Sequence, residues 1–181
     1  MRILGIDPGT RFLGWGVVEV RGPQLDACGY GVLKANPRAP LPERLATLAA
    51  GLRDVIQTHH PEVAAVEEAF YGRDARATLR LGEGRGAALL VLSEAGLPIT
   101  GYANNVVQRA VTGGGRATTE RVRAMVVRML ALAEVPDSLD ASDALAGALC
   151  LHQRLGPAGV GPAGPSPRIQ EAIRRARRER R

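Results

Sequence analysis

The chain of 181 residues carries a formal net charge of +6, and 45% of its residues are hydrophobic. This length favours one domain with an ordinary core, and the hydrophobic content excludes a disordered protein. The longest uncharged apolar run, Gly86–Ser93, is far shorter than the roughly 18 residues of a membrane span, and no secretory signal follows Met1. We therefore expect a cytoplasmic protein.

Most of the positive charge lies at the C-terminal end. Seven Arg and two Glu give residues 168–181 a charge of +5, which leaves about +1 for the rest of the chain. Residues 156–167 are dense in Gly and Pro, as an extended linker is. We predict one domain over residues 1–155, and a linker with a basic, disordered tail over residues 156–181. Such a tail could bind any phosphate backbone or be a solvated charge run.

The first part of the chain is predicted to form strands and then a helix. Strands are predicted at Arg2–Asp7, Phe12–Val20 and Gln24–Ala35, each bounded by Gly or Pro. Three consecutive strands favour an antiparallel meander. Leu41–His59 has apolar residues at helical spacing, and Pro61 follows its end.

The second part alternates between strand and helix and then becomes helical. We predict a strand at Val63–Glu67, a helix at Ala75–Ala95, a strand at Leu97–Tyr102, and three helices at Asn104–Val111, Thr118–Leu132 and Leu139–Arg154. This order of elements predicts an α/β fold, with a mixed five-stranded sheet and helices on both of its faces.

Four acidic residues fall at the ends of predicted core elements. Asp7 and Glu67 end the first and fourth strands, which we expect to be neighbours. Asp140 and Asp143 lie three apart on the last helix and so share a face. Converging carboxylates repel one another unless a cation lies between them, and an oxygen-only ligand set selects Mg²⁺ or Mn²⁺ over Zn²⁺. We therefore predict a site for two divalent ions that supports attack on a phosphodiester.

Each acid also has a plainer explanation. Asp7 could open a β-turn through its side chain, and Glu67 could form a solvated pair with the Glu that follows it. Asp140 could lie in the first turn of its helix, with Asp137 or Ser138 as the N-cap. Taken together, these explanations leave the placement of all four acids a coincidence.

Five sequence blocks together resemble one known family. They are GIDPGT at 5–10, VEEAF at 66–70, LRLGEGRGAA at 79–88, YANNV at 102–106 and DASDALAGAL at 140–149. In this order and spacing they resemble the RuvC family of Holliday junction resolvases, over the body of the chain and not the tail. The resemblance implies a ribonuclease H-like fold in which Asp7, Glu67, Asp140 and Asp143 are the catalytic, metal-binding acids.

A similar Asp-x-Gly-Thr loop opens the actin, Hsp70 and sugar-kinase ATPases. Two features argue against that class of protein. The chain is too short for two lobes, and it has an acidic helix near its C-terminal end.

The resemblance also implies contacts and partners. Phe70 matches an aromatic residue that engages an unpaired base, with Tyr71 beside it, although a ring closing the core is the alternative. The helix with Gly82, Gly84 and Gly86 would pack closely and belong to the interface of a homodimer, because paired cuts in a four-way junction require twofold symmetry. A junction-binding protein and a hexameric branch-migration motor are the further partners implied.

The basic residues depart from the family. Where resolvases usually carry two lysines, this chain has Gln108 and Thr119. Arg109, Arg116 and Arg121 are close enough in sequence to contact DNA phosphates instead, although Arg differs from Lys in shape and cannot donate its proton. Other residues of chemical interest are interpreted as structural: Trp15 as core, Cys28 and Cys150 as buried thiols, and His59, His60 and His152 as non-ligands.

The sequence therefore predicts a metal-dependent, structure-selective endonuclease that resolves Holliday junctions in DNA recombination and repair. Two alternatives stay open. One is another ribonuclease H-like nuclease that acts on RNA, which would prefer an RNA hairpin. The other is a nucleic-acid-binding protein without catalysis, in which the acids are turn and cap residues and the basic tail binds; it would show no metal dependence.

Overall fold

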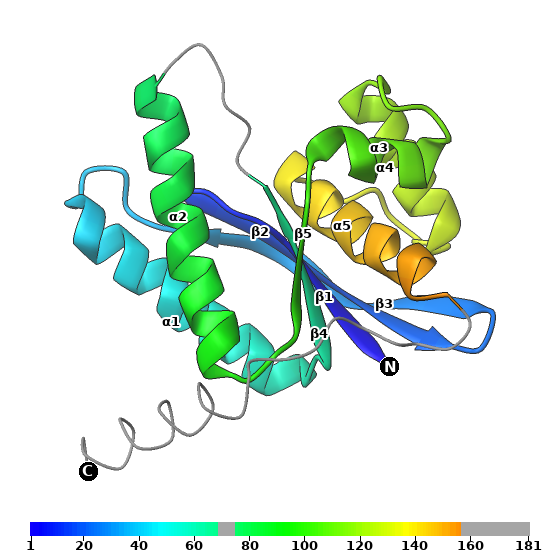
Figure 1. Ribbon diagram of the computed structural model, residues 1–181, viewed down its shortest axis with the longest axis horizontal. Coiled ribbons are helices and arrows are strands. Elements are labelled where there is room, and N and C mark those ends of the chain that lie inside the picture. Colours follow the sequence, from blue (N-terminus) through cyan, green and yellow to red (C-terminus); the bar gives the residue numbers. More distant parts are fainter. Residues whose placement is uncertain (69–74, 157–181) are drawn as a thin grey trace.

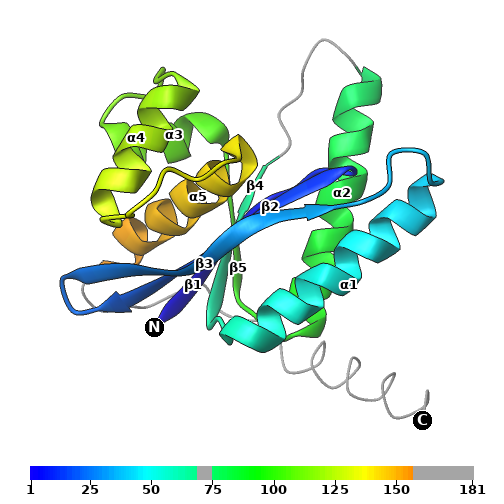
Figure 2. The same ribbon diagram turned by 180° about the vertical axis from the view of Figure 1, so that it is seen from behind.

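The computed structural model describes residues 1–68 and 75–156, which form a five-stranded sheet between two layers of helices (Figures 1 and 2). The strands are β1 (Arg2–Asp7), β2 (Phe12–Arg21), β3 (Gln24–Lys34), β4 (Val63–Glu67) and β5 (Ile99–Tyr102). Their order in the sheet is β3-β2-β1-β4-β5. The predicted α/β class is confirmed. Residues 157–181, which include most of the predicted linker and tail, lie outside the described residues.

Strand β1 is the centre of the sheet and pairs in both directions. It is antiparallel to β2, which is antiparallel to β3, so the predicted meander is confirmed. It is parallel to β4, with Ile3 opposite Val63 and Ile6 opposite Val66, and β4 is parallel to β5. The first and fourth strands are neighbours as predicted, and their C-terminal ends meet at one edge of the sheet.

Helices cover both faces of this sheet. Helices α1 (Leu41–His59) and α2 (Ala75–Glu94) lie on one face, and α3 (Asn104–Thr112), α4 (Thr119–Met129) and α5 (Leu139–Leu155) lie on the other (Figures 1 and 2). Because side chains alternate along a strand, each face has its own core. Leu4 and Ile6 pack with α1 and α2, whereas Ile3 packs with α3, α4 and α5. No helix of the described residues is long and apolar enough to cross a membrane.

Helix α5 lies directly against the sheet backbone. A Cβ atom on Gly5 of β1 would lie only 1.8 Å from the carbonyl oxygen of Ala144, so the approach requires glycine at this position. Most of the helix between Ala141 and Leu151 is buried. The close approach brings the first turn of α5 to the sheet edge where β1 ends.

Two element boundaries differ from the prediction, and the others agree to within one residue. Strand β5 begins two residues late because Leu97 lies in the turn that follows α2, where its N–H donates to the carbonyl oxygen of Leu92 at 3.1 Å. Helix α4 ends at Met129, three residues early, because Ala131 takes a left-handed φ of 46° and turns the chain away from the helix.

The residues interpreted as structural agree with that role except in one respect. Trp15 packs against the core beneath α1, with its ring 5.2 Å from that of His59, and His60 ends α1 with a left-handed φ of 48°. Cys150 is buried, but the prediction of a buried Cys28 is wrong. Cys28 is half-buried because it lies on β3, an edge strand of the sheet.

Candidate metal centre and nucleic-acid interface

Asp7 and Glu67 lie on adjacent strands at the C-terminal edge of the sheet. Strands β1 and β4 are parallel and Ile6 pairs with Val66, so Asp7 and Glu67 are the next residues of the two strands. Both side chains are half-buried, whereas the following Glu68 is exposed. Glu67 is therefore not one half of a solvated pair.

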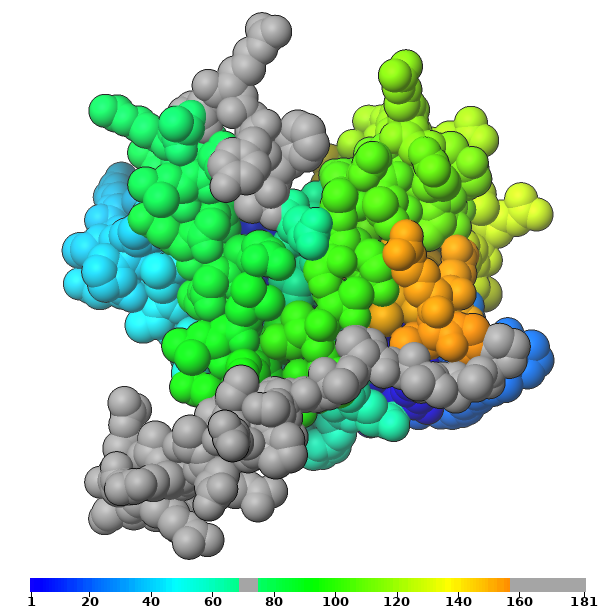
Figure 3. All heavy atoms as spheres, viewed as in Figure 1, coloured from blue at the N-terminus to red at the C-terminus, as the bar shows by residue number. Residues whose placement is uncertain are grey.

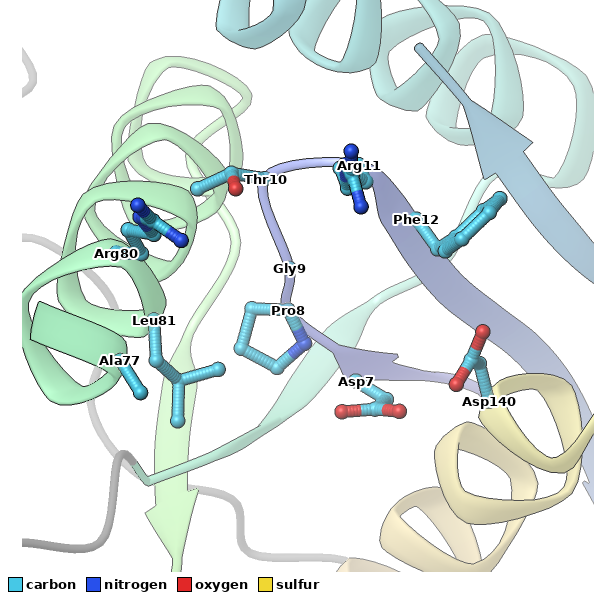
Figure 4. Close-up of a pocket in the computed structure, with 10 residues that line it drawn as sticks. All are labelled: Asp7, Pro8, Gly9, Thr10, Arg11, Phe12, Ala77, Arg80, Leu81 and Asp140. Carbon is cyan, nitrogen blue, oxygen red and sulfur yellow. The ribbon is translucent and has the colours of Figure 1, made fainter. Parts of the chain in front are cut away.

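Helix α5 brings the other two acids to the same edge. Asp7 pairs with Gly14 of β2, and a Cβ atom on Gly14 would lie 2.1 Å from the carbonyl oxygen of Asp140. The helix begins at this point because Ser138 is its N-cap, and the Asp140 N–H donates to the Ser138 Oγ at 3.1 Å. Asp143 follows on the same face of the helix. Asp140 thus does lie in a first helical turn, and that turn lies beside Asp7 (Figure 4).

The four carboxylates are near enough to perturb one another. Burial is the main cause that raises the pKa of Asp7 from 3.8 to about 8, and the charges of Glu67, Asp143 and Asp140 add to it. Burial, followed by the charge of Asp140, raises the pKa of Asp143 to about 6. Burial and Asp143 likewise raise the pKa of Glu67, and a hydrogen bond with the Asn104 side chain offsets part of that rise.

Among the described residues, no cationic side chain pairs with these acids. Within residues 1–68 and 75–156, none of the four acids forms an ion pair, and the Asp7 side chain makes no hydrogen bond that would mark it as a turn residue. A buried, unpaired cluster of acids is unfavourable unless a cation binds. The donors are all carboxylate oxygens, which fits a hard divalent ion such as Mg²⁺ or Mn²⁺.

The four acids reach this edge of the sheet from three elements, β1, β4 and α5. Among the described residues, no three Asp, Glu, His or Cys side chains are already grouped as a metal site.

A pocket of about 420 Å³ opens beside Asp7 and Asp140 (Figure 4). Its other walls are the loop after β1 and the first turns of α2, and they include residues that the sequence analysis did not single out. Arg11 and Arg80 line the pocket, as does Phe12, whose side chain is 50% exposed. The position of Arg11 directly after the DPGT loop was a signal in the sequence, whereas nothing in the sequence connects Arg80 to this loop.

The three predicted phosphate-binding arginines meet in a second pocket. Arg109 of α3, Arg116 of the α3–α4 loop and Arg121 of α4 line a cavity of about 680 Å³, together with the backbone of Gly113, Gly114 and Gly115. This pocket belongs to the α3–α5 side of the sheet. Phe70 and Tyr71, the predicted base contacts, lie outside the described residues.

Two further side chains support the backbone and carboxylate of Glu67. Asn104, the first residue of α3, forms the hydrogen bond with the Glu67 side chain noted above. Arg85 of α2 donates from Nε to the Glu67 carbonyl oxygen at 3.2 Å. Both lie within the sequence blocks that resemble the resolvases, but their roles depend on contacts between elements and could not be derived from the sequence.

Comparison with known proteins gives one consistent family. A family model described as crossover junction endodeoxyribonuclease RuvC matches residues 3–152. Curated relatives of that description include a protein of Dechloromonas aromatica, 47% identical over 148 residues (82% of each chain), and one of Chloroflexus aggregans, 47% identical over 150 residues (83% of this chain and 92% of that one).

Solved structures agree. The structure of T. thermophilus RuvC in complex with a Holliday junction substrate is 36% identical to this chain and superposes with a TM-score of 0.82, over 90% of this chain and 99% of that one. The yeast mitochondrial Holliday junction resolvase Ydc2 has a TM-score of 0.57 at 13% identity, over 98% of this chain and 82% of that one, and so shares the fold alone.

Proposed function

We propose a function for this chain from its family, because the chain belongs to the crossover junction endodeoxyribonuclease RuvC family. It is a structure-selective endonuclease that resolves four-way DNA junctions by paired phosphodiester cuts. The observation that carries the proposal is the convergence of four carboxylates, from β1, β4 and α5, at one edge of the sheet. The two alternatives, an RNA nuclease and a binding protein without catalysis, are not favoured by the family or by this buried acidic cluster.

Nucleases of this family use a divalent metal, and we propose that Asp7, Glu67, Asp140 and Asp143 hold two Mg²⁺ or Mn²⁺ ions. Such ions, when bound, activate a water molecule and offset charge on the leaving 3′ oxygen. The protein contributes the fixed positions of the ligands. Ser138 holds the turn that carries Asp140, and Asn104 orients the Glu67 carboxylate.

The arginine pocket at α3 and α4 is proposed to hold the DNA backbone next to the acids. Positive charge is needed there because the carboxylates repel the strand and the metals offset only part of that repulsion. Arg116 follows three consecutive glycines, which leave its backbone free to move toward a phosphate. We therefore assign Arg116 the leading part, with Arg109 and Arg121 as neighbouring contacts, and Phe70 and Tyr71 as contacts to an unpaired base.

The outer side of α2 is proposed to form a homodimer interface. Leu79 and Leu90 on this helix are 65% and 58% exposed, and Cβ atoms on Gly82 and Gly86 would meet none of the described residues within 4 Å. These positions recur at helical spacing along one side of α2. Helix α2 as a whole is visible at the molecular surface (Figure 3). A twofold axis through this surface would present two acidic sites to two strands, as paired cuts require. A junction-binding protein and a branch-migration motor are the further partners proposed.

The test is incubation with a synthetic immobile four-way junction, with and without Mg²⁺ or Mn²⁺. The wild type should cut two opposing strands only when metal is present. Asp7→Asn should bind the junction and fail to cut it, because removing one negative charge from the ligand set weakens metal binding but leaves the phosphate contacts intact. An Asn variant that cuts at nearly the wild-type rate in saturating metal would show that the site is assigned wrongly.

A further inference from the structure

A third pocket, of about 270 Å³, lies on the α1–α2 side of the sheet edge. Its walls are Thr10, Arg11, Pro37, Arg44 and Arg80. The three arginines come from three separate segments, the loop after β1, helix α1 and helix α2. None of the described residues that line the pocket is acidic, so their combined charge is strongly positive.

The arginines of this pocket have no partner in the part of the chain that the structure describes. None of them is in an ion pair there, unlike Arg2 and Arg21, which both contact Glu19, and Arg53, which contacts Glu94 at 3.0 Å. The Nε of Arg44 is buried and donates to no acceptor. A buried donor without an acceptor is unfavourable, and an acceptor oxygen of a bound ligand would satisfy it.

Close packing of glycines fixes this pocket relative to the acidic site. A Cβ atom on Gly84 of α2 would lie 2.5 Å from the Gly9 carbonyl oxygen, so the helix and the loop after β1 touch through their backbones. Arg80 lies one helical turn before Gly84, on the same side of α2. The contact therefore holds Arg80 beside Thr10 and Arg11, and the prediction that glycines of this helix serve close packing is confirmed for Gly84.

The pocket continues into the acidic site. Thr10, Arg11 and Arg80 line both this pocket and the larger one that reaches Asp7 and Asp140 (Figure 4). The pocket of Arg109, Arg116 and Arg121 belongs to the opposite face of the sheet. The acids thus lie between two basic pockets, an arrangement that suits one strand crossing the sheet edge.

We propose that the Thr10–Arg11–Arg44–Arg80 pocket binds a backbone phosphate of the strand being cut, on the α1–α2 side of the scissile phosphate. A phosphate has acceptor oxygens for all three guanidinium groups, the Arg44 Nε and the Thr10 hydroxyl. The inference rests on the proposed junction cleavage and adds a fixed second point of attachment to it. Phosphate contacts on both sides of the acids would fix the direction of the strand across them. Contacts in one basic pocket alone would leave that direction free.

The experiment neutralises DNA phosphates one at a time. Four-way junctions carry a single methylphosphonate at successive positions of the two equivalent strands, and binding of the full-length protein is measured without divalent metal. For the wild type, one substitution outside the scissile position should weaken binding at least fivefold. For Arg44→Gln/Arg80→Gln, the same substitution should weaken binding less than twofold, because the contact is already absent. Arg53→Gln, on the exposed side of α1, is the control: it removes one guanidinium charge outside the pocket and should keep the wild-type profile.

Failure of this inference differs from failure of the proposed function. If the wild type cuts the unmodified junction in Mg²⁺ and the double variant keeps every methylphosphonate effect of the wild type, the pocket does not bind a phosphate and the nuclease assignment stands. If the wild type neither binds nor cuts junctions, both proposals are wrong. Thermal unfolding of each variant verifies that it is folded.

Discussion

At the scale of single residues, burial and the neighbouring acids disfavour the charged form of the Asp7 carboxyl in the metal-free protein. Its pKa of about 8 means that the folded state retains a proton that the unfolded chain releases near its ordinary pKa of 3.8. Between these two values the folded state binds more protons, so stability falls as pH rises, and the loss levels off above pH 8. This pH dependence of stability is opposite to that of a salt-bridged acid, whose lowered pKa makes the protein more stable as pH rises.

We therefore predict that Asp7→Asn stabilises the metal-free protein at pH 8 and has little effect at pH 4. The expected gain at pH 8 is about 1–3 kcal/mol, because each pKa unit corresponds to about 1.4 kcal/mol and partial hydration reduces the full shift. Thermal unfolding in chelator at pH 4, 6 and 8 measures the difference. Adding Mg²⁺ or Mn²⁺ should stabilise the wild type more than the variant. A less stable Asn variant at pH 8 would contradict the electrostatic description of the site.

Arg116 carries the second prediction at this scale. Arg116→Ala should slow single-turnover junction cleavage at least tenfold, or about 1.4 kcal/mol, because it removes positive charge beside the acids. Adding Thr119→Lys should recover part of the loss. Arg128→Ala, at an exposed position of α4 that does not line the pocket, is the control and should cut normally. Unchanged cleavage in Arg116→Ala would shift the role to Arg109 or Arg121.

The sequence predicted the location of a site residue where that location depends on its position within one strand or helix. Asp7 and Glu67 end apolar strands, and Asp140 and Asp143 share a helical face, so their positions follow from periodicity once the strands are known to be neighbours. Arg44 and Arg80 are different. They lie 36 residues apart on two helices, and only the packing of α1 and α2 brings them into one pocket.

At the scale of elements, the packing of α5 on β2 depends on a residue without a side chain. A Cβ atom on Gly14 would lie 2.1 Å from one backbone oxygen and 2.5 Å from the carbonyl carbon of Asp140. A helix backbone cannot move aside as a flexible side chain can. Gly14 therefore helps to set the position of Asp140 relative to Asp7, together with Gly5, which lies against Ala144 farther along α5.

Gly14→Ala should displace the start of α5 and impair both stability and cleavage. We expect a loss of about 1–3 kcal/mol in the free energy of unfolding, as for other overpacked sites. The cleavage rate should fall even at temperatures where the variant is fully folded. Gly147→Ala on α5 is the matched control. Its Cβ would lie an ordinary 4.0 Å from the Ala65 Cβ, so it should be neutral or stabilise the helix by roughly 0.5–1 kcal/mol. Equal effects of the two substitutions would argue against the steric explanation.

The element boundaries show where sequence reasoning was limited. The periodicity of the chain predicted the type and order of the ten elements that the described residues form. It did not predict that Leu97 lies in the turn after α2, or that Ala131 takes a left-handed conformation, because both depend on the turns that follow helices. It also treated Gly82, Gly84 and Gly86 alike, although only Gly84 contacts the rest of the protomer closely.

At the scale of the whole molecule, the exposed side of α2 allows a test of the proposed dimer. Leu90→Glu should convert the dimer to a monomer, because it places a charge at an apolar position that is 58% exposed. Sedimentation analysis measures the change. Paired cuts should give way to single, uncoupled nicks, which a cruciform plasmid distinguishes as nicked rather than linear product. Val135→Glu, at a position 53% exposed away from α2, should remain dimeric. A dimeric Leu90→Glu protein would place the interface elsewhere.

The arrangement of the acids along the chain also has a consequence for protein synthesis. Asp7 and Glu67 emerge early from the ribosome, whereas Asp140 and Asp143 belong to α5, which begins at Leu139 and is the last element of the described domain. α5 also supplies much of the core on its face of the sheet. A nascent chain therefore has only two of the four site carboxylates in place until this helix has been translated and has docked on the sheet. Completion of the fold and onset of DNA cleavage should coincide, so that partly made chains do not nick the chromosome.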